Sequence, residues 1–563
     1  IVCMRGRQEG LDLFRLWYQE LEERRSKGLG PWKDQEERIR ILWDGIACWP
    51  YLSNTYKTLK RYGINLVTST YPDSWTILYE AGDLDGMARA YSSNYVNRNL
   101  AFGADNIAQL VKEFSLDGII FHSNRSCKLM DFRQLEIQRQ VAERTGVASV
   151  MFDGDQTDPS TFSMAQFETR IQSLVEMVEA KRKETAMCEV QDLLQELCEC
   201  ARHPAQTVKS WMQWEGRGAV GCFPLYGPEE IIDAAGLLPV GLWGGTTKPQ
   251  LCEKYVQPFC CSIMKANLEQ GIQGQYDELT AVTIPCFCDT LKCVCENWKV
   301  AVPQIPLIPM VYPQNRTSSG AVAYLEAEFQ TVVERLEELT GKTITEEDLE
   351  RGYQRLQASR AAQRQFVQLA GEHSDVVSAS IRHLVIKAGW FMDRGEYAEK
   401  LNQINRLLAQ REPVEPKGLR LVVTGISMEP EALLDVMDNC GVTVVADDLA
   451  QESRQFGRPG EPQGTVLSRM ARNFLGMSGD PLVWDQEKHR GEKLIRLAQE
   501  SKADGVLVIM MKFCDPEEFD YPIYKKELEA AGIPILYTET ELSMTSMAHL
   551  QTRLEGFGEM LNR

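Results

Sequence analysis

The chain alternates between short apolar runs and longer amphipathic stretches, a pattern typical of parallel βαβ units. Near residue 40 the apolar run "IRILWDG" is followed by a turn, a helical stretch and a second apolar run, "INLVTSTY". Near residue 420 "LRLVVTG" opens the same succession and "VTVVADDL" closes it. The pattern therefore predicts an α/β protein with repeated Rossmann-like or flavodoxin-like lobes on parallel sheets.

These two regions belong to a long internal repeat. "LDGIIFHSNRSCK" (116–128) and "ADGVLVIMMKFCD" (503–515) each place a cysteine ten residues after an aspartate, at Cys127 and at Cys514. A glycine at an expected helix end then follows, nineteen residues after Cys127 and eighteen after Cys514. A repeat of this length predicts the same fold for both regions.

A further α/β lobe and a helical stretch lie between the repeats. "GAVGCFPLYGPEEIIDAAGLLPVGLWG" indicates a strand, a Pro-started helix and a second strand, and two more apolar runs follow at 281–286 and 305–312. Residues 320–412 have a helical period, with a capping box at Thr345 and Asp348. The chain is thus expected to consist of a helical segment at 1–38, α/β lobes at 39–182 and 183–319, a helical segment at 320–415 and a last lobe at 416–563.

The composition narrows the class of protein. Asp and Glu outnumber Lys and Arg by 80 to 61, which argues against general binding to nucleic acids or anionic membranes. No apolar run approaches the roughly 18 residues of a membrane span, and no signal peptide is recognisable, so we expect a cytoplasmic protein. "GRGAVG" (216–221) fits a dinucleotide motif, but the strand follows it instead of preceding it. There is also no Walker A sequence, so hydrolysis of ATP by this chain is not expected.

Cysteines form the densest group of reactive residues. Sixteen cysteines in 563 residues are too few for a disulfide scaffold, and clustered thiols in the cytoplasm indicate metal ligands or reactive groups. "CCSIMK" places Cys260 and Cys261 before a helix, and "CFCDTLKCVC" (286–295) follows an apolar strand. With six histidines in the chain, a thiolate-rich site favours iron–sulfur or zinc. The spacing matches neither a ferredoxin nor a zinc ribbon, which leaves metal binding and buried thiols as two open alternatives.

The strand pattern adds a reason to expect a metal site. Open α/β sheets present ligands at the carboxyl ends of their strands, and Cys127 and Cys514 fall where such strands end. We therefore expect a metal cluster held between two lobes, with two thiolates from 260–295 and one from Cys514. His122 is interpreted as a packing or surface residue at a strand end, in preference to a metal ligand.

At these residues the sequence resembles the 2-hydroxyacyl-CoA dehydratase family. "GIACWP", "HSNRSCK" and "FDGDQTDPSTFSMAQFETRIQ" resemble the C-terminal part of an α subunit. From about residue 187 onward, "GCFPLYGPEEIIDAAGLLPV", "CFCDTLK" and "MKFCDPEEFDYP" resemble a complete β subunit. The resemblance covers nearly the whole chain and explains the internal repeat as the homology between the two subunits.

The resemblance implies a 4Fe-4S cluster in a cleft between two α/β lobes of the β-like half. Its three ligands would be Cys261, Cys288 and Cys514, with Cys260 and Cys286 as adjacent alternatives. In the α-like half the resemblance implies one cluster ligand, Cys127. The α-subunit N-terminal lobe, which supplies two further cysteines and much of the substrate pocket, is missing from the sequence. A second cluster is therefore expected only if a companion subunit supplies that lobe.

The resemblance also implies a reaction of anaerobic amino-acid fermentation, the dehydration of a (R)-2-hydroxyacyl-CoA to the 2-enoyl-CoA, with 2-hydroxyglutaryl-CoA as the favoured substrate. The β-proton is not acidified by a neighbouring carbonyl, so ordinary acid–base catalysis has little leverage. One electron delivered to the thioester makes a ketyl radical that expels the hydroxyl group and acidifies this proton. A separate ATP-dependent iron–sulfur activator protein would supply the electron.

Two alternatives remain at this stage. The first is a benzoyl-CoA reductase-like subunit, although "SNRSCK" and "DGDQ" look closer to the dehydratases. The second is a non-catalytic fragment that binds zinc or the activator. A brown protein with charge-transfer absorption would support iron–sulfur clusters, whereas a colourless protein with stoichiometric zinc would support the second alternative.

Overall fold

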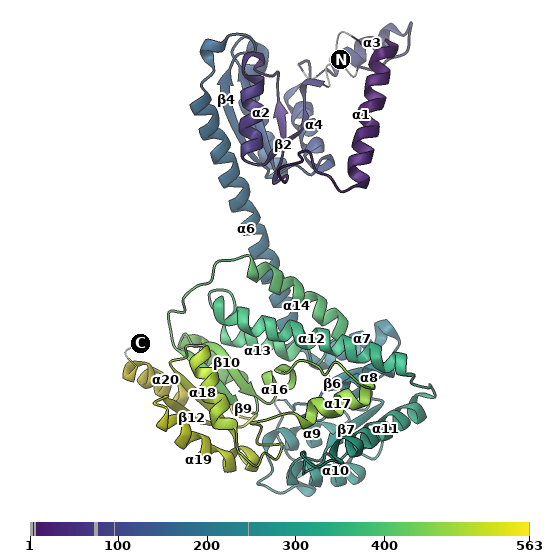
Figure 1. Ribbon diagram of the computed structural model, residues 1–563, viewed down its shortest axis with the longest axis vertical. Helices are drawn as coiled ribbons and strands as arrows, with labels where there is room; N and C mark the ends of the chain where they lie inside the picture. The colour runs from purple at the N-terminus through teal and green to yellow at the C-terminus, as the bar shows by residue number, and fades with distance from the viewer. Residues whose placement is uncertain (1–3, 5–6, 73–76, 95, 246, 562–563) are drawn as a thin grey trace. The chain divides into compact units, whose positions relative to one another are not determined.

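The structure, a computed structural model, describes residues 4, 7–72, 77–94, 96–245 and 247–561 (Figure 1). The chain divides into two compact units, a first unit of Ile1–Ala186 and a second unit of Met187–Arg563. The boundary lies within the long helix α6 (Met164–Arg202). None of the helices in these described ranges is long and apolar enough to cross a membrane.

The described residues form three four-stranded sheets that share one topology. In each sheet all strands are parallel, and the second strand lies at the edge, followed by the first, the third and the fourth. This arrangement confirms the predicted α/β class with repeated lobes on parallel sheets. The strands are β1 (Ile39–Asp44), β2 (Ile64–Ser69), β3 (Gly118–Asn124) and β4 (Ala148–Gly154) in the first unit, and β5 (Ala219–Cys222), β6 (Leu238–Gly241), β7 (Ala281–Pro285), β8 (Leu307–Met310), β9 (Arg420–Gly425), β10 (Thr443–Leu449), β11 (Gly505–Met511) and β12 (Ile535–Thr540) in the second.

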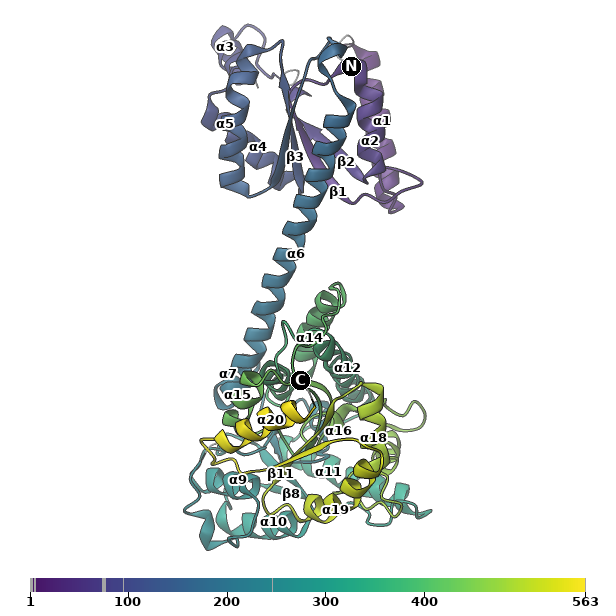
Figure 2. The same ribbon diagram turned by 90° about the vertical axis from the view of Figure 1, so that its left-hand side faces the viewer.

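The sheet of the first unit is covered on both faces. Because successive strand residues point to opposite faces, Ile41 and Ile120 join one apolar cluster with α6, while Leu42 and Ile119 join another with α4 and α5. Figure 2 shows α4 and α5 on one side of the sheet and α6 on the other. The helices of this unit besides α6 are α1 (Gln8–Ser26), α2 (Leu52–Arg61), α3 (Leu84–Ser92), α4 (Leu100–Glu113) and α5 (Lys128–Thr145).

The second unit contains two sheets and the predicted helical segment. The expected capping box is present at the start of α12, where the side chains of Thr345 and Asp348 each accept a hydrogen bond from the other residue's backbone N–H. Figure 1 shows α12 beside α14, and Asn405 donates a hydrogen bond between them to the carbonyl of Ala362. The helices are α7 (Pro204–Glu215), α8 (Glu229–Ala234), α9 (Ser262–Ile272), α10 (Asp289–Ala301), α11 (Ala321–Thr340), α12 (Glu346–Glu372), α13 (Ala379–Ala388), α14 (Arg394–Ala409), α15 (Glu431–Asn439), α16 (Ser453–Phe456), α17 (Val466–Leu475), α18 (Arg490–Glu500), α19 (Asp515–Ala530) and α20 (Ala548–Met560).

A glycine at the carboxyl end of the first strand lies close to the backbone of the third strand in each copy of the repeat. Gly425 has a φ of +146°, and a Cβ placed on it would come within 2.1 Å of the carbonyl oxygen of Ile509 on β11. Gly45 has a φ of +95° and lies in the same way against His122 on β3. Only glycine allows this approach without strain, and it occurs near the carboxyl ends of the strands, where the repeated cysteines follow.

Candidate functional site

Three cysteines of the second unit stand at the starts of three helices. Cys261 is the N-terminal cap of α9, Cys288 of α10 and Cys514 of α19. Cys288 and Cys514 follow β7 and β11, which are the third strands of their sheets and border the point where the strand order reverses. Ligands of open α/β sheets bind at this position. A helix N-terminus also carries partial positive charge, which stabilises a thiolate.

The three thiols lie near one another. Burial raises the pKa of Cys514 well above its usual range, and negative charge on Glu517, Cys261 and Cys288 raises it further. Burial also raises the pKa of Cys288 to about 11, and charge on Cys261 adds to this rise. All three side chains pack against the same apolar cluster. The sequence-predicted ligands Cys261, Cys288 and Cys514 therefore share one site, formed by the two α/β lobes of the second unit.

Contacts at the start of α9 join the two lobes beside this site. The hydroxyl of Ser262 accepts a hydrogen bond from the backbone N–H of Leu542 at 3.1 Å, and it lies 3.1 Å from the sulfur of Met511 at the end of β11. The ammonium group of Lys265 lies 5.7 Å from the ring centroid of Phe513. Its positive charge is one of the influences that lower the pKa of Cys261, after the hydrogen bond from Cys260.

The two alternative cysteines each pair with another thiol. Cys260 is hydrogen-bonded to Cys261, which raises the pKa of Cys260. Cys286 is hydrogen-bonded to Cys295, and this bond lowers the pKa of Cys286 to about 7. The neighbouring charges that raise the pKa of Cys514 are those of Glu517, Cys261 and Cys288. The assignment of Cys261 and Cys288 as ligands, in preference to Cys260 and Cys286, stays a prediction.

The donor set fits an iron–sulfur cluster in chemical type, because such clusters are held by cysteine thiolates. Within the described ranges no group of three His, Cys, Asp or Glu side chains is arranged so that it could hold a metal ion. A cluster of four irons does not require three side chains to surround one ion. Each thiolate binds a different iron, so the ligands stand farther apart than those around a single ion.

Cys127, the fourth predicted ligand, belongs to the first unit, whereas the three cysteines described above belong to the second. It caps the N-terminus of α5, directly after β3, so it repeats the position of Cys514. Its backbone N–H donates to the carbonyl of Asn124 at 2.9 Å. Its placement at a strand end therefore agrees with the internal repeat.

Sequence reasoning missed a buried pair in the first unit. The Sγ of Cys48 lies 3.2 Å from Nε2 of His122, whose Nδ1 lies 2.6 Å from the carbonyl oxygen of Ile46. Burial lowers the pKa of His122 and raises that of Cys48 to about 12, so both groups are neutral near pH 7. The ring of His122 stacks on Phe152 with centroids 5.0 Å apart. His122 is a packing residue, as the sequence indicated, but nothing in the spacing pointed to Cys48.

A buried ionic network behind Cys514 was also missed. Glu517, in the first turn of α19, pairs with Arg454 at 2.8 Å and with Arg490 at 2.7 Å. Arg454 also pairs with Asp448 at 3.0 Å, and all four side chains are buried. The pKa of Asp448 is held below its usual range because these cations outweigh the effect of burial. These residues lie on four separate elements, so their partnership leaves no local signal in the sequence.

The comparison with protein families identifies the chain. The family model described as "2-hydroxyglutaryl-CoA dehydratase, D-component" matches residues 1–178 and 224–561. The chain belongs to this family. The resemblance inferred from the cysteine-bearing motifs is thereby confirmed.

Two of the relatives that match over a long stretch of the chain are β subunits of dehydratases. The chain is 36% identical over 359 residues to the (R)-phenyllactyl-CoA dehydratase β subunit of Clostridium sporogenes, a match that covers 64% of this chain and 96% of that protein. It is 38% identical over 378 residues to the β subunit of the lactoyl-CoA dehydratase of Anaerotignum propionicum, a match that covers 67% of this chain and all of that protein.

The α subunits match over a shorter length. The chain is 46% identical over 183 residues to the (R)-2-hydroxyisocaproyl-CoA dehydratase α subunit of Clostridioides difficile, a match that covers 32% of this chain and 45% of that protein. The chain thus spans less than half the length of this α-subunit relative. A solved structure titled "Nitrogenase Cp1 at pH 6.5" aligns with 92% of this chain and 88% of its own at 8% identity, but its TM-score of 0.15 is too low to support an argument.

Proposed function

We propose that this chain takes part in the iron–sulfur-dependent dehydration of a (R)-2-hydroxyacyl-CoA to the 2-enoyl-CoA. The observation that carries the proposal is the meeting of Cys261, Cys288 and Cys514 at one site, in a chain that aligns with dehydratase β subunits over essentially their whole length. We further propose that these three thiols hold one 4Fe-4S cluster. Cys127 would hold a second cluster together with a companion lobe.

The residues of the site suit this role. Each of the three cysteines stands at a helix N-terminus, whose partial positive charge attracts a thiolate, and the ammonium group of Lys265 also helps to lower the pKa of Cys261. The three cysteines are half-buried and pack against an apolar cluster. A bound cluster with three protein ligands would supply one-electron chemistry and one open iron.

The reaction needs partners that this chain does not supply by itself. A ketyl radical of the thioester requires one electron, and we propose an ATP-dependent iron–sulfur activator protein as its source. An α-subunit N-terminal lobe or a companion subunit would complete the substrate pocket. The acyl group favoured in this proposal is 2-hydroxyglutaryl.

Anaerobic reconstitution tests the cluster. Full-length protein treated with iron and sulfide is expected to turn brown and to bind about four irons in the β-like half. Changing Cys261, Cys288 or Cys514 to serine is expected to remove most of that iron. The exposed Cys293 provides the matched control, since Cys293→Ser leaves the three sulfurs in place. A colourless wild-type protein with one equivalent of zinc would instead support the non-catalytic alternative.

Activity tests the reaction. The protein is mixed with activator, reductant, ATP and a companion α subunit, and lactoyl-, phenyllactyl- and 2-hydroxyglutaryl-CoA are offered in turn. Formation of the enoyl-CoA, lost in the cysteine variants, is the expected result. Benzoyl-CoA belongs in the same panel, because the chain is 24% identical over 334 residues to one of the subunits of the benzoyl-CoA reductase of Thauera aromatica. Reduction of benzoyl-CoA without dehydration of any hydroxyacyl-CoA would overturn the proposal.

A further inference from the structure

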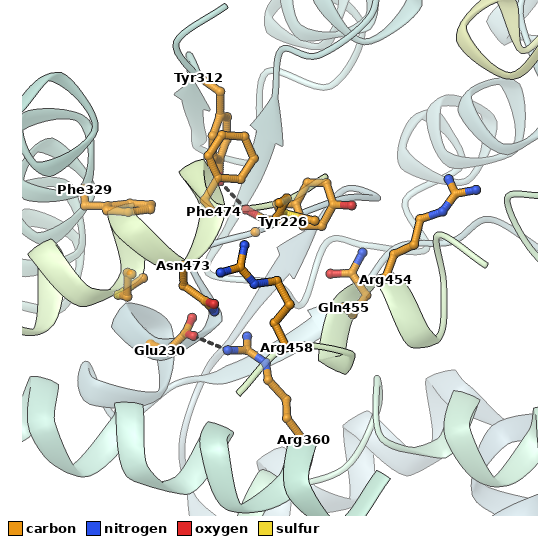
Figure 3. A pocket seen from close by; sticks show the side chains of 13 residues that line it. Tyr226, Glu230, Tyr312, Phe329, Arg360, Arg454, Gln455, Arg458, Asn473 and Phe474 are labelled. Atoms are coloured by element: carbon orange, nitrogen blue, oxygen red, sulfur yellow. Dashed lines mark hydrogen bonds and ion pairs between the residues drawn. The ribbon is translucent and has the colours of Figure 1, made fainter. Parts of the chain in front are cut away.

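A pocket in the second unit concentrates positive charge in an acidic protein. Its volume is about 70 Å³, and its lining includes Arg360, Arg454 and Arg458 but a single acidic side chain, Glu230 (Figure 3). The chain as a whole carries a net charge of −19. A local excess of cations against that background attracts anions to this position.

Two of the three arginines are already paired with carboxylates. Arg360 lies 2.5 Å from Glu230, and Arg454 is held by Asp448 and Glu517 in the buried network described above. These ion pairs neutralise much of their charge. The positive charge available to a ligand therefore belongs mainly to Arg458.

Arg458 points into the pocket with unused hydrogen-bonding capacity. Its Nη1 is buried and has no hydrogen-bond partner among the described residues, although 41% of the side chain as a whole is exposed. Its ion-pair partner Glu461 is as far as 4.0 Å away. The Oδ1 of Asn473, which also lines the pocket, has no partner among these residues either. A buried guanidinium nitrogen without an acceptor is unfavourable, and an anionic ligand would supply that acceptor.

Gly476 makes room for this guanidinium. A Cβ placed on Gly476 would come within 2.4 Å of Nη1 and 2.6 Å of Nη2 of Arg458. The absence of a side chain at residue 476 therefore leaves the space that the charged group occupies. The space at Gly476 is a second structural feature, besides the unpaired Nη1, that concerns the guanidinium nitrogens of Arg458.

The rest of the lining is aromatic and apolar. Tyr312 and Phe474 pack with ring centroids 4.5 Å apart, and Tyr226 lies 5.7 Å from Phe474. Burial and the nearby Asp480 raise the pKa of Tyr226 well above its usual range, so its hydroxyl stays protonated and donates to Asp480. At 10–15 Å³ per water-sized group, the pocket holds on the order of five such groups. A carboxylate with a short carbon chain has this size and this mixture of charge and apolar surface.

We propose that this pocket binds the carboxylate of a small organic acid, with Arg458 as its anchor. The pocket adjoins the candidate cluster site, since Tyr226 lies 5.6 Å from the ring of Phe287, the residue before Cys288. The acid is therefore either the distal carboxylate of a dicarboxylic acyl-CoA or a free acid that acts beside the site. The inference does not depend on the proposed dehydration, because binding can be measured on protein that contains no iron.

Calorimetric titration with glutarate tests the proposal. The full-length wild-type protein is expected to bind glutarate saturably, and Arg458→Gln is expected to weaken binding at least tenfold. Gly476→Ala is expected to weaken it as well, because the new Cβ displaces the guanidinium. Arg335→Gln serves as the control, since Arg335 is an exposed arginine on α11 paired with Glu338. Circular dichroism checks that all variants fold.

Titration with acyl-CoA thioesters separates the two sources of the carboxylate. If glutaryl-CoA binds more tightly than lactoyl-CoA in the wild-type protein and equally in Arg458→Gln, the carboxylate is that of the substrate. If Arg458→Gln weakens the binding of free glutarate but not that of glutaryl-CoA, the carboxylate in the pocket belongs to a separate acid. No saturable binding of glutarate, or equal binding by wild-type and Arg458→Gln proteins, would overturn the proposal. A loss of binding in Arg335→Gln equal to that in Arg458→Gln would overturn it too.

Discussion

His383 on α13 lies fully buried between two carboxylates. Its Nδ1 lies 2.8 Å from Glu452 and its Nε2 lies 3.3 Å from Glu429. Both ring nitrogens face acceptors, which requires both to carry a proton. Burial lowers the pKa of His383, but the hydrogen bonds and charges of Glu429 and Glu452 outweigh burial, and the pKa is raised. The histidine is therefore a cation that links α13 to the last lobe.

This raised pKa predicts a dependence of stability on pH. The unfolded histidine titrates near about 6.5. Its contribution to stability is therefore fully present below that pH and is lost as pH rises through the higher pKa of the folded state. Urea unfolding of the wild-type protein at pH 6 and pH 9 is expected to show a larger fall in stability than that of His383→Gln. His203→Gln, which changes an exposed histidine, should behave like the wild type. Equal pH dependence in all three proteins would refute this assignment.

At the scale of elements, α12 lies unusually close to α8. A Cβ placed on Gly352 of α12 would come within 2.5 Å of the carbonyl oxygen of Glu230 and 3.1 Å of the backbone nitrogen of Ala234. Backbone atoms cannot turn aside as a side chain can. The glycine is therefore what allows the helical segment to pack against the lobe that carries Cys261 and Cys288.

Two alanine substitutions in the same helix are expected to have opposite effects. Replacing a helical glycine by alanine favours the helix by about 0.5–1 kcal/mol when space allows. Gly371→Ala meets this condition, because its nearest neighbour would be 3.5 Å away, and should be neutral or stabilising. Gly352→Ala must push two backbones apart and should destabilise the protein by about 1–3 kcal/mol. Thermal or urea unfolding measures both, and a stable Gly352→Ala protein would contradict the close packing.

Features were predictable from the sequence when the residues that form them are neighbours along the chain. The strand that ends before Cys514 was predictable because seven consecutive residues of β11 are buried and apolar. The capping box of α12 was predictable because both partners lie within one turn. The close contact at Gly352 and the pairing of Glu517 with Arg454 were not, since in each case the partners lie on separate elements and share no local pattern. The pocket around Arg458 was missed for the same reason.

At the scale of the whole chain, each apolar cluster of the described residues falls within one unit. The two parts of the helix α6 belong to the cores of different units. Ile171 and Leu174 in its first part are buried in the core of the first unit, while Leu194 and Leu197 in its second part are buried with α12 and α14. Each unit thus has the apolar core that independent folding requires.

A fragment of residues 187–563 is therefore expected to fold alone. It retains the buried part of α6 that packs in the second unit, together with both of its sheets. Its thermal transition, followed by circular dichroism, should coincide with one of two transitions of the full-length chain. A fragment that is unfolded at 25 °C would show that the second unit depends on residues 1–186 for its stability.

The hydrogen bond between Cys286 and Cys295 has a practical consequence for handling the protein. This hydrogen bond lowers the pKa of Cys286 to about 7, whereas burial raises the pKa values of Cys288 and Cys514, so Cys286 is expected to ionise more readily than these two when no iron is bound. Brief treatment of iron-free protein with iodoacetamide, followed by peptide mass spectrometry, should find Cys286 alkylated before Cys288 and Cys514. Exposure to air is expected to oxidise this sulfur, two residues from a proposed iron ligand, before those of Cys288 and Cys514.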